Sequence, residues 1–182
     1  GCHAPDGTQP GHEVRTVTDC YGTEIVVPVH PERVVSVGVS TDDVLIPLLG
    51  TKRIVAIAEL MPNLEKESEE IKGRISGSTE SVLQYAPDLV VVPSWKSAEY
   101  VDEIRSAGIP VYVYQMPVTT EKIIGMIHEL ADLVGEPENG NRLARKTEDR
   151  IRNLHNFLQT ISEKDRLTAV LARPNGIGGG SG

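Results

Sequence analysis

Residues 80–93 read ESVLQYAPDLVVVP, and this stretch decides the predicted fold. A serine or threonine at 78–79 can cap a short helix, and Glu80 lies in its first turn, where the helix dipole favours a negative charge. Pro87 ends that helix, because a proline forces the residue before it out of helical geometry. The apolar run Leu89–Val92 is typical of a strand that is buried on both faces, and such strands are usually parallel. A helix followed directly by such a strand is the unit of an α/β fold.

The same order of elements recurs along the chain. Each apolar run is followed by a polar cap, an amphipathic helix and a glycine or proline that stops the helix. Right-handed crossovers between parallel strands therefore predict a Rossmann-like, three-layer α/β lobe, with a mixed α+β domain as the alternative. The predicted strands are 33–37, 53–57, 89–92 and 110–114, and the predicted helices after the first strand are 44–49, 80–86, 98–107 and 120–134.

The pattern changes after Pro137. Apolar residues recur at steps of three and four from 139 to about 165, with mostly charged residues between them, which predicts one long helix with a single buried face. A coiled coil is the alternative. Residues 167–171 (LTAVL) then resemble the first strand of another lobe. We therefore expect a flexible tether at 1–13, an N-terminal α/β lobe at 14–138, a long interlobe helix at 139–165, and the start of an incomplete second lobe at 166–182.

Composition narrows the possible partners. The chain has 182 residues, a formal net charge of −8 and only 4% aromatic residues. Nucleic-acid binding relies on a basic stripe and on aromatic side chains for stacking, so we expect no nucleic-acid partner. The hydrophobic content of 39% is enough for a folded domain. No apolar run is long enough to span a membrane.

The two cysteines lie in different settings. Cys2 stands near the head of a polar segment rich in Pro and Gly, which is the arrangement left when a bacterial lipoprotein signal is cleaved. The alternative is the remnant of a tag followed by an ordinary free thiol. A disulfide with Cys20 is unfavourable, because a mobile arm is a poor partner. We interpret Cys2 as a lipidation site, and Cys20 as a small hydrophobic residue.

Several segments together carry a family resemblance. VTDCYGTEIVVP at 17–28 and PERVVS at 31–36 resemble the opening of periplasmic binding proteins for iron complexes, haem and cobalamin, the class III substrate-binding proteins of ABC transporters. LLG at 48–50 with RIVA at 53–56, the stretch 80–92, and the long helix resemble later family segments in the same order. Each motif is weak alone, but five in the right order are fairly specific. The resemblance covers about residues 14–176.

The resemblance implies binding rather than catalysis. Such proteins hold a metal chelate between two α/β lobes joined by a stiff helix, and they deliver it to an ABC permease. Glu80 falls where the family carries an acidic residue that docks on permease arginines; as a plain alternative, it serves only the helix dipole. The family's haem-binding branch has a tyrosine a few residues before this glutamate, whereas here residues 73–75 are Gly-Arg-Ile, which favours a siderophore or cobalamin over haem. The implied protein is extracytoplasmic and touches the membrane only through a lipid anchor.

A ligand cleft is also expected from topology. In open parallel sheets, small molecules bind beyond the carboxyl ends of the strands. Trp95 at a strand tip, beside Lys96, suits stacking on a flat macrocycle or pairing with an anionic chelate, although the ring can instead pack on a helix. Met61 and Met116 are able to contact haem iron, but a methionine at such positions more often only lines the cleft. The predicted ligand-binding residues are Ser40, Thr41, Glu59, Met61, Ser94, Trp95, Lys96, Gln115 and Met116.

Other chemistry finds little support in the sequence. The five histidines lack the paired spacing of a metal site, and no nucleophile triad or paired carboxylates are evident, so we expect no direct metal binding, no cofactor and no catalytic residues. A Rossmann-like enzyme would need a glycine-rich phosphate turn, and residues 37–40 supply one glycine. A sensory or surface-interaction domain on the same fold stays open as the alternative to transport.

Overall fold

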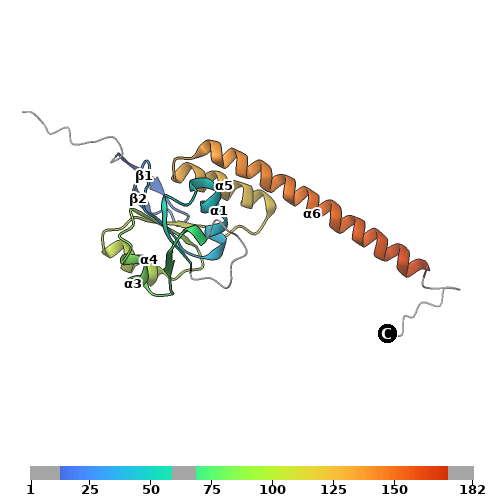
Figure 1. The fold of residues 1–182 in the computed structure, drawn as a ribbon, viewed down its shortest axis with the longest axis horizontal. Helices are drawn as coiled ribbons and strands as arrows, with labels where there is room; N and C mark the ends of the chain where they lie inside the picture. The colour runs from blue at the N-terminus through green and yellow to red at the C-terminus, as the bar shows by residue number, and fades with distance from the viewer. Residues whose placement is uncertain (1–12, 59–68, 172–182) are drawn as a thin grey trace, which may run out of the picture. The chain divides into compact units, whose positions relative to one another are not determined.

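The computed structural model describes residues 13–58 and 69–171. Its centre is a parallel sheet with the strand order β5-β4-β3-β6-β7 (Figure 1). The four predicted strands are confirmed; β5 was missed, because it has only three residues and carries Arg74 at its centre. The strands are β3 (Val34–Ser36), β4 (Ile54–Ala58), β5 (Gly73–Ile75), β6 (Leu89–Pro93) and β7 (Val111–Tyr114).

Helices cover both faces of the sheet, as the uninterrupted apolar strands predicted. Successive residues of β6 point to opposite sides: Leu89 and Val91 pack with α1 (Val39–Leu49) and α5 (Thr120–Leu133), whereas Val90 and Val92 pack with α3 (Thr79–Leu83) and α4 (Ala98–Ser106). All four side chains are fully buried. The lobe is therefore a three-layer α/β structure with two hydrophobic cores.

The helix cap predicted at 78–79 is confirmed, because the Ser78 side chain accepts a hydrogen bond from the backbone at the start of α3. The side chains of Ser97 and Thr119 cap α4 and α5 in the same way. The start of α1 was predicted wrongly, because the polar run 40–43 was interpreted as a cap. The helix begins at Val39, after Gly38 at φ 96°, so the polar run forms its first turn.

An antiparallel hairpin precedes the sheet and was not predicted. It pairs β1 (Val14–Thr18) with β2 (Glu24–Pro28). Asp19 Oδ1 accepts hydrogen bonds from the amides of Tyr21 and Thr23, each at 3.0 Å, and so holds the turn. The amide of Cys20 donates to Val113 O at 3.1 Å, which joins the turn to the edge strand β7. The Cys20 thiol is exposed, so its interpretation as a small hydrophobic residue is wrong.

The long helix is longer than predicted. α6 runs from Pro137 to Leu171, so the strand predicted at 167–171 is wrong. No glycine or proline interrupts the chain between Gly140 and Pro174. Once a helix has formed, each added residue gains a backbone hydrogen bond, so the helix continues through 167–171. Thr168 Oγ1 donates to Lys164 O at 2.8 Å, as threonine does within helices.

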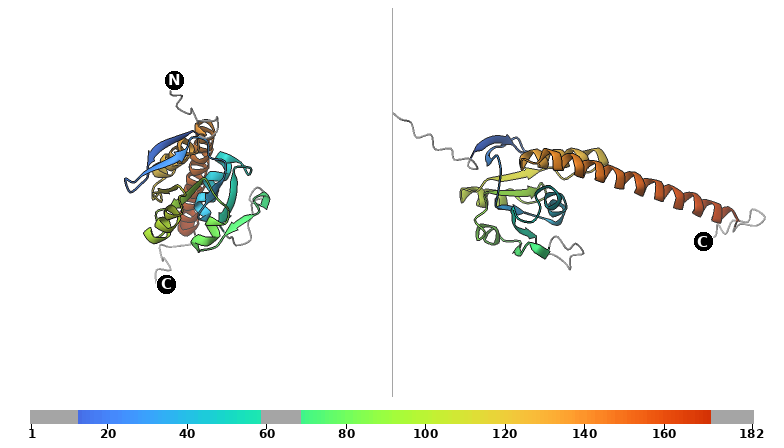
Figure 2. Two further views of the ribbon diagram at one scale, coloured as in Figure 1. Left: turned by 90° about the vertical axis from the view of Figure 1, so that its left-hand side faces the viewer. Right: turned by 45° about the horizontal axis from the view of Figure 1, so that its top comes forward.

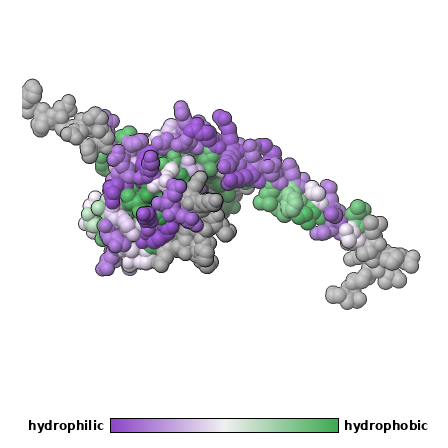
Figure 3. Space-filling view, viewed as in Figure 1, coloured by the Kyte–Doolittle hydropathy of each residue, from purple (hydrophilic) through white to green (hydrophobic). Residues whose placement is uncertain are grey.

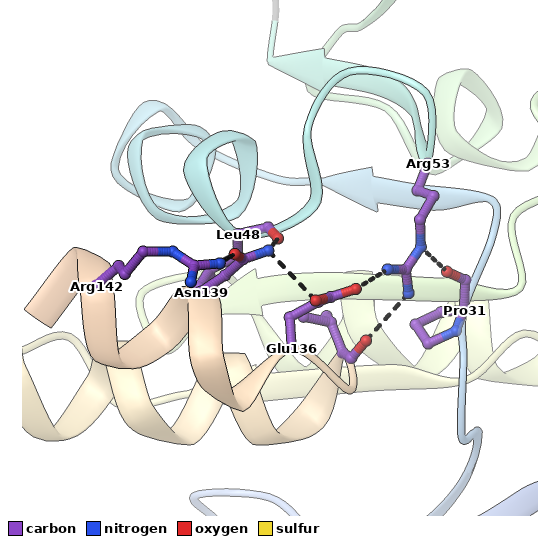
Figure 4. Close-up of polar contacts among 7 residues, drawn as sticks. Pro31, Leu48, Arg53, Glu136, Asn139 and Arg142 are labelled. Atoms are coloured by element: carbon purple, nitrogen blue, oxygen red, sulfur yellow. Dashed lines mark hydrogen bonds and ion pairs between the residues drawn. The ribbon is translucent and has the colours of Figure 1, made fainter.

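The chain divides into two compact units between Ala144 and Arg145, within α6. In the first unit, α5 and the first turns of α6 lie side by side (Figure 2). Gly140 allows this approach, because a Cβ there would lie 2.3 Å from the Cβ of Ala131. Asn139 Nδ2 donates to Leu48 O at 2.9 Å (Figure 4). The start of α6 is thus part of the lobe's core.

In the second unit, α6 carries apolar side chains that are exposed. They gather on one stretch of the helix (Figure 3). The predicted single apolar face is therefore present, although within this unit nothing described covers it. None of the described helices is long and apolar enough to cross a membrane. The exposed side chains of the stretch are Leu154, Phe157, Leu158 and Ile161.

Candidate ligand-binding edge

The carboxyl ends of β3 and β7 meet through a cluster of hydroxyl groups. Thr41 Oγ1 donates to Val37 O at 2.7 Å and lies 2.6 Å from the hydroxyl of Tyr114. Because the Thr41 proton is already used, Tyr114 is the donor in this pair. Ser40 Oγ lies 3.3 Å from the same Tyr114 hydroxyl and donates to Met116 Sδ at 3.7 Å. The sequence predicted Ser40, Thr41 and Met116, and the structure brings them together.

Tyr114 was missed by the sequence analysis. It is fully buried at the last position of β7, so it looked like an ordinary core residue. Burial raises the pKa of its hydroxyl, which therefore stays protonated and able to donate. The signal in the sequence was its place at the end of a strand, one residue before the predicted Gln115. Tyr114 therefore holds the Thr41 hydroxyl in place, with the Ser40 hydroxyl beside it.

The loop after β6 joins the same edge. Ser94 Oγ accepts a hydrogen bond from the amide of Met116 at 3.1 Å, which connects the ends of β6 and β7. Gln115 is exposed beside this bond. Three of the four predicted strand-end loops therefore lie within hydrogen-bonding reach of one another. The fourth loop holds Glu59 and Met61, which lie outside the described residues, as does Cys2.

Trp95 forms an exposed aromatic surface at this edge. Its side chain is 59% exposed, and the ring lies over Gly38, where an added Cβ would be 3.4 Å from the ring. The Lys96 ammonium lies 5.2 Å from the centre of the Trp95 ring and 4.4 Å from that of Tyr100. The edge therefore presents a flat apolar surface beside a cation, which suits a planar or anionic ligand.

Comparisons with known proteins identify the family and the fold of this chain. The sequence profile of the family described as periplasmic binding protein matches residues 34–181. This chain belongs to that family. A comparison with curated protein sequences gave no match.

Solved structures of periplasmic binding proteins have the same fold. The haem-binding protein HmuT is 22% identical with a TM-score of 0.55, and the alignment covers 78% of this chain and 47% of HmuT. The Haemophilus influenzae molybdate-binding protein MolA is 21% identical with a TM-score of 0.62, over 72% of this chain and 49% of MolA. A periplasmic haem-binding protein from Pseudomonas aeruginosa is 17% identical with a TM-score of 0.63, over 74% and 49%. The chain spans about half the length of these proteins.

A buried carboxyl group below the edge was also missed. Asp42 is 3% exposed, and its Oδ1 accepts a hydrogen bond from Ser36 Oγ at 2.5 Å. Oδ2 is buried and has no hydrogen-bond partner among the described residues. Burial raises the pKa of Asp42 to about 7; the Ser36 hydroxyl and, more weakly, the Ala58 amide and the Arg74 charge oppose this effect. The sequence analysis included Asp42 in the polar run 40–43 at the start of the helix and did not predict its burial.

Glu80 lies in the first turn of the five-residue α3 and is exposed. The preceding residue, Thr79, donates a hydrogen bond through Oγ1 to Oε2 of Glu103 on α4, at 2.7 Å. Glu80 is therefore accessible to a partner, as a docking carboxylate requires. Its two predicted roles are docking on a permease and a favourable interaction with the helix dipole, and both stay predictions.

Metal chemistry was not expected at this edge. Among the described residues, no group of three or more His, Cys, Asp or Glu side chains is placed to hold an ion. His128 on α5 and His155 on α6 are exposed, as predicted for helix surface residues. The groups that converge on the edge are instead hydroxyls, a thioether, an indole and an ammonium. This set is suited to holding a molecule by contact and hydrogen bonding.

Proposed function

We propose that this chain is the first lobe of the extracytoplasmic solute-binding component of an ABC importer. The observation that carries the proposal is the joining of three strand-end loops, through Tyr114, Ser94 and Met116, into one edge with an exposed tryptophan. Family membership supports it, because the family is one of binding proteins. The proposed role of this chain is therefore to bind a solute and not to catalyse a reaction. Cys2 is proposed as the site of a lipid anchor.

The proposed ligand is a metal chelate: a ferric siderophore, cobalamin or haem. Support comes from the chemistry of the edge, where the Trp95 ring can stack on a flat or apolar ligand face and the Lys96 ammonium can offset negative charge. Solved relatives with the same fold are described as binding haem and molybdate. We propose that a second lobe supplies the other half of the cleft. The solved relatives are about twice as long as the part that aligns with this chain, so they have room for such a lobe.

The ligand proposal is tested by titrating the full-length protein with haem, cobalamin and a panel of ferric siderophores. We expect one compound to bind saturably, and Trp95→Ala to weaken that binding about tenfold, since an aromatic contact contributes roughly 1 kcal/mol beyond its buried area. Isothermal titration calorimetry measures both constants. The matched control is Val26→Ala, which removes a similarly exposed apolar side chain from β2 of the hairpin, outside the ligand-binding edge.

Two results would count against this ligand site. If no compound in the panel binds, the proposal of a metal chelate is overturned, and a sensory or surface-interaction domain becomes the better interpretation. If a compound binds but its affinity is the same for Trp95→Ala and Val26→Ala, the ligand lies elsewhere.

The proposed partner is an ABC permease, which Glu80 would contact through a cationic residue. Reversing the charge with Glu80→Lys is expected to reduce uptake at least tenfold in cells while ligand affinity stays unchanged, because an ion pair is replaced by repulsion between like charges. Uptake of radiolabelled ligand measures the effect. Glu121→Lys on α5 is the control for a change of surface charge. Normal uptake by cells that carry Glu80→Lys would contradict the proposed docking role of Glu80.

A further inference from the structure

A separate pocket lies between the turn of the β1–β2 hairpin and α4. Its accessible volume is about 400 Å³, which is within the range of small-molecule sites. Tyr21 of the turn forms one wall, Val101 and Arg105 of α4 form another, and Val113 of the edge strand β7 contributes apolar surface. Lys96 also lines the pocket, although its neighbour Trp95 does not. The pocket is therefore adjacent to the ligand-binding edge but has its own walls.

The walls of this pocket are held in place by hydrogen bonds from three directions. Arg105 Nη2 donates to the buried Asp19 Oδ2 at 2.9 Å and to Val111 O at 2.8 Å, which ties α4 to the turn and to β7. Tyr21 donates through its hydroxyl to Ser94 O at 3.1 Å, so the turn is also tied to the loop after β6. A pocket fixed in this way loses little entropy when it binds a ligand.

Two cationic side chains line the pocket. Lys96 makes no ion pair with the described residues and contacts only the rings of Trp95 and Tyr100 through its ammonium. Arg105 has its charge balanced by Asp19, yet its Nε is buried and has no hydrogen-bond partner among the described residues. The lining also includes one carboxylate, from Asp102. An acceptor with negative charge would pair with the Lys96 ammonium and lie beside the Arg105 guanidinium.

We propose that this pocket binds a small organic carboxylate. The carboxylate pairs with the Lys96 ammonium beside the Arg105 guanidinium, and the apolar part of the molecule packs on Val101 and Val113. The site does not depend on the proposed transport function, because none of its residues except Lys96 belongs to the ligand-binding edge. Because Lys96 belongs to both sites, a carboxylate bound here would also change the charge beside Trp95.

Benzoate is a suitable probe, because it combines a carboxylate with a flat apolar ring. In a titration at constant ionic strength, we expect the methyl resonances of Val101 and Val113 to shift saturably, with a dissociation constant of about 1 mM or tighter. Benzyl alcohol, which has the same ring without the charge, is expected to bind at least tenfold more weakly. Methyl NMR spectroscopy of the labelled chain follows both titrations.

Three variants test the assignment of charge. Lys96→Met is expected to weaken benzoate binding at least tenfold, and Asp102→Asn to strengthen it several-fold, because one change removes an attractive charge and the other a repulsive one. Lys122→Met, an exposed lysine on α5 outside the pocket, is expected to leave the affinity unchanged. No saturable shift below about 50 mM, or equal affinities for Lys96→Met and Lys122→Met, would overturn the proposal.

Discussion

Replacing Asp42 by asparagine is expected to make the protein more stable at pH 8 by up to about 4 kcal/mol, while leaving its stability near pH 4 almost unchanged. Few single substitutions of a buried polar residue increase stability. Here the wild-type carboxylate is buried with Oδ2 unpartnered, so its charged form is costly in the folded state. Asparagine keeps an acceptor for the Ser36 hydroxyl without carrying the charge.

The direction of this effect follows from the two pKa values of Asp42. The carboxyl has a pKa of 3.8 when solvated and about 7 in the folded protein. Between these values the folded state binds more protons than the unfolded state, so the free energy of unfolding falls as the pH rises from about 4 to about 7. The difference between the two pKa values corresponds to about 4 kcal/mol, which sets the upper limit of the gain.

Urea denaturation of wild type and Asp42→Asn at pH 4, 5, 6, 7 and 8 measures this difference. Because both proteins share every other carboxylate, subtracting the two curves isolates Asp42. Asp102→Asn, which removes an exposed carboxylate from α4, serves as the control and is expected to differ from wild type by less than about 0.5 kcal/mol at every pH. A constant difference between wild type and Asp42→Asn across this pH range would contradict the elevated pKa.

Replacing Arg53 by methionine is expected to cost about 3 kcal/mol of stability, because it breaks a largely buried ion pair and leaves Glu136 without its cation. Arg53 is 16% exposed as a side chain and donates to Glu136 Oε1 at 2.7 Å (Figure 4). It also donates to Pro31 O at 2.8 Å and to Val134 O at 3.0 Å. These bonds join the start of β4 to the segment that enters α6.

Chemical denaturation monitored by circular dichroism measures the loss. The matched control is Arg152→Met, because Arg152 pairs with Asp149 on the surface of α6 and both side chains are about two-thirds exposed. That pair is expected to contribute at most about 0.5 kcal/mol. Arg53→Lys should lie between wild type and Arg53→Met, since it keeps the charge but loses the planar fork. A cost below about 1 kcal/mol for Arg53→Met would show that the network does not hold the lobe together.

Local patterns predicted most of the lobe because each pattern has a direct physical cause. The apolar run Leu89–Val92 requires cover on both faces, Pro87 excludes a continuing helix, and Ser78 supplies the cap of α3. The prediction failed where the local signal was short or ambiguous. β5 has three residues, and Leu167–Leu171 contains residues that fit either a strand or a helix.

The candidate site was predicted in part. Ser40, Thr41, Ser94 and Met116 were found from topology alone, since loops at the carboxyl ends of parallel strands meet at one edge. Tyr114 and Asp42 were missed, because the sequence does not show that a tyrosine hydroxyl inside a strand reaches two helix hydroxyls, or that a polar residue in a helical turn faces inward.

The sequence by itself determined the α/β fold class, the positions of the four main strands along the chain, the long helix and the family resemblance, because periodicity, helix caps and stop residues act over a few neighbouring residues. Only the tertiary structure decided which side chains meet. The Tyr114–Thr41 contact, the Arg53–Glu136 pair and the pocket beside Arg105 each join residues that are far apart in the chain. The raised pKa of Asp42 likewise has its cause in burial by the whole lobe, which no local pattern encodes.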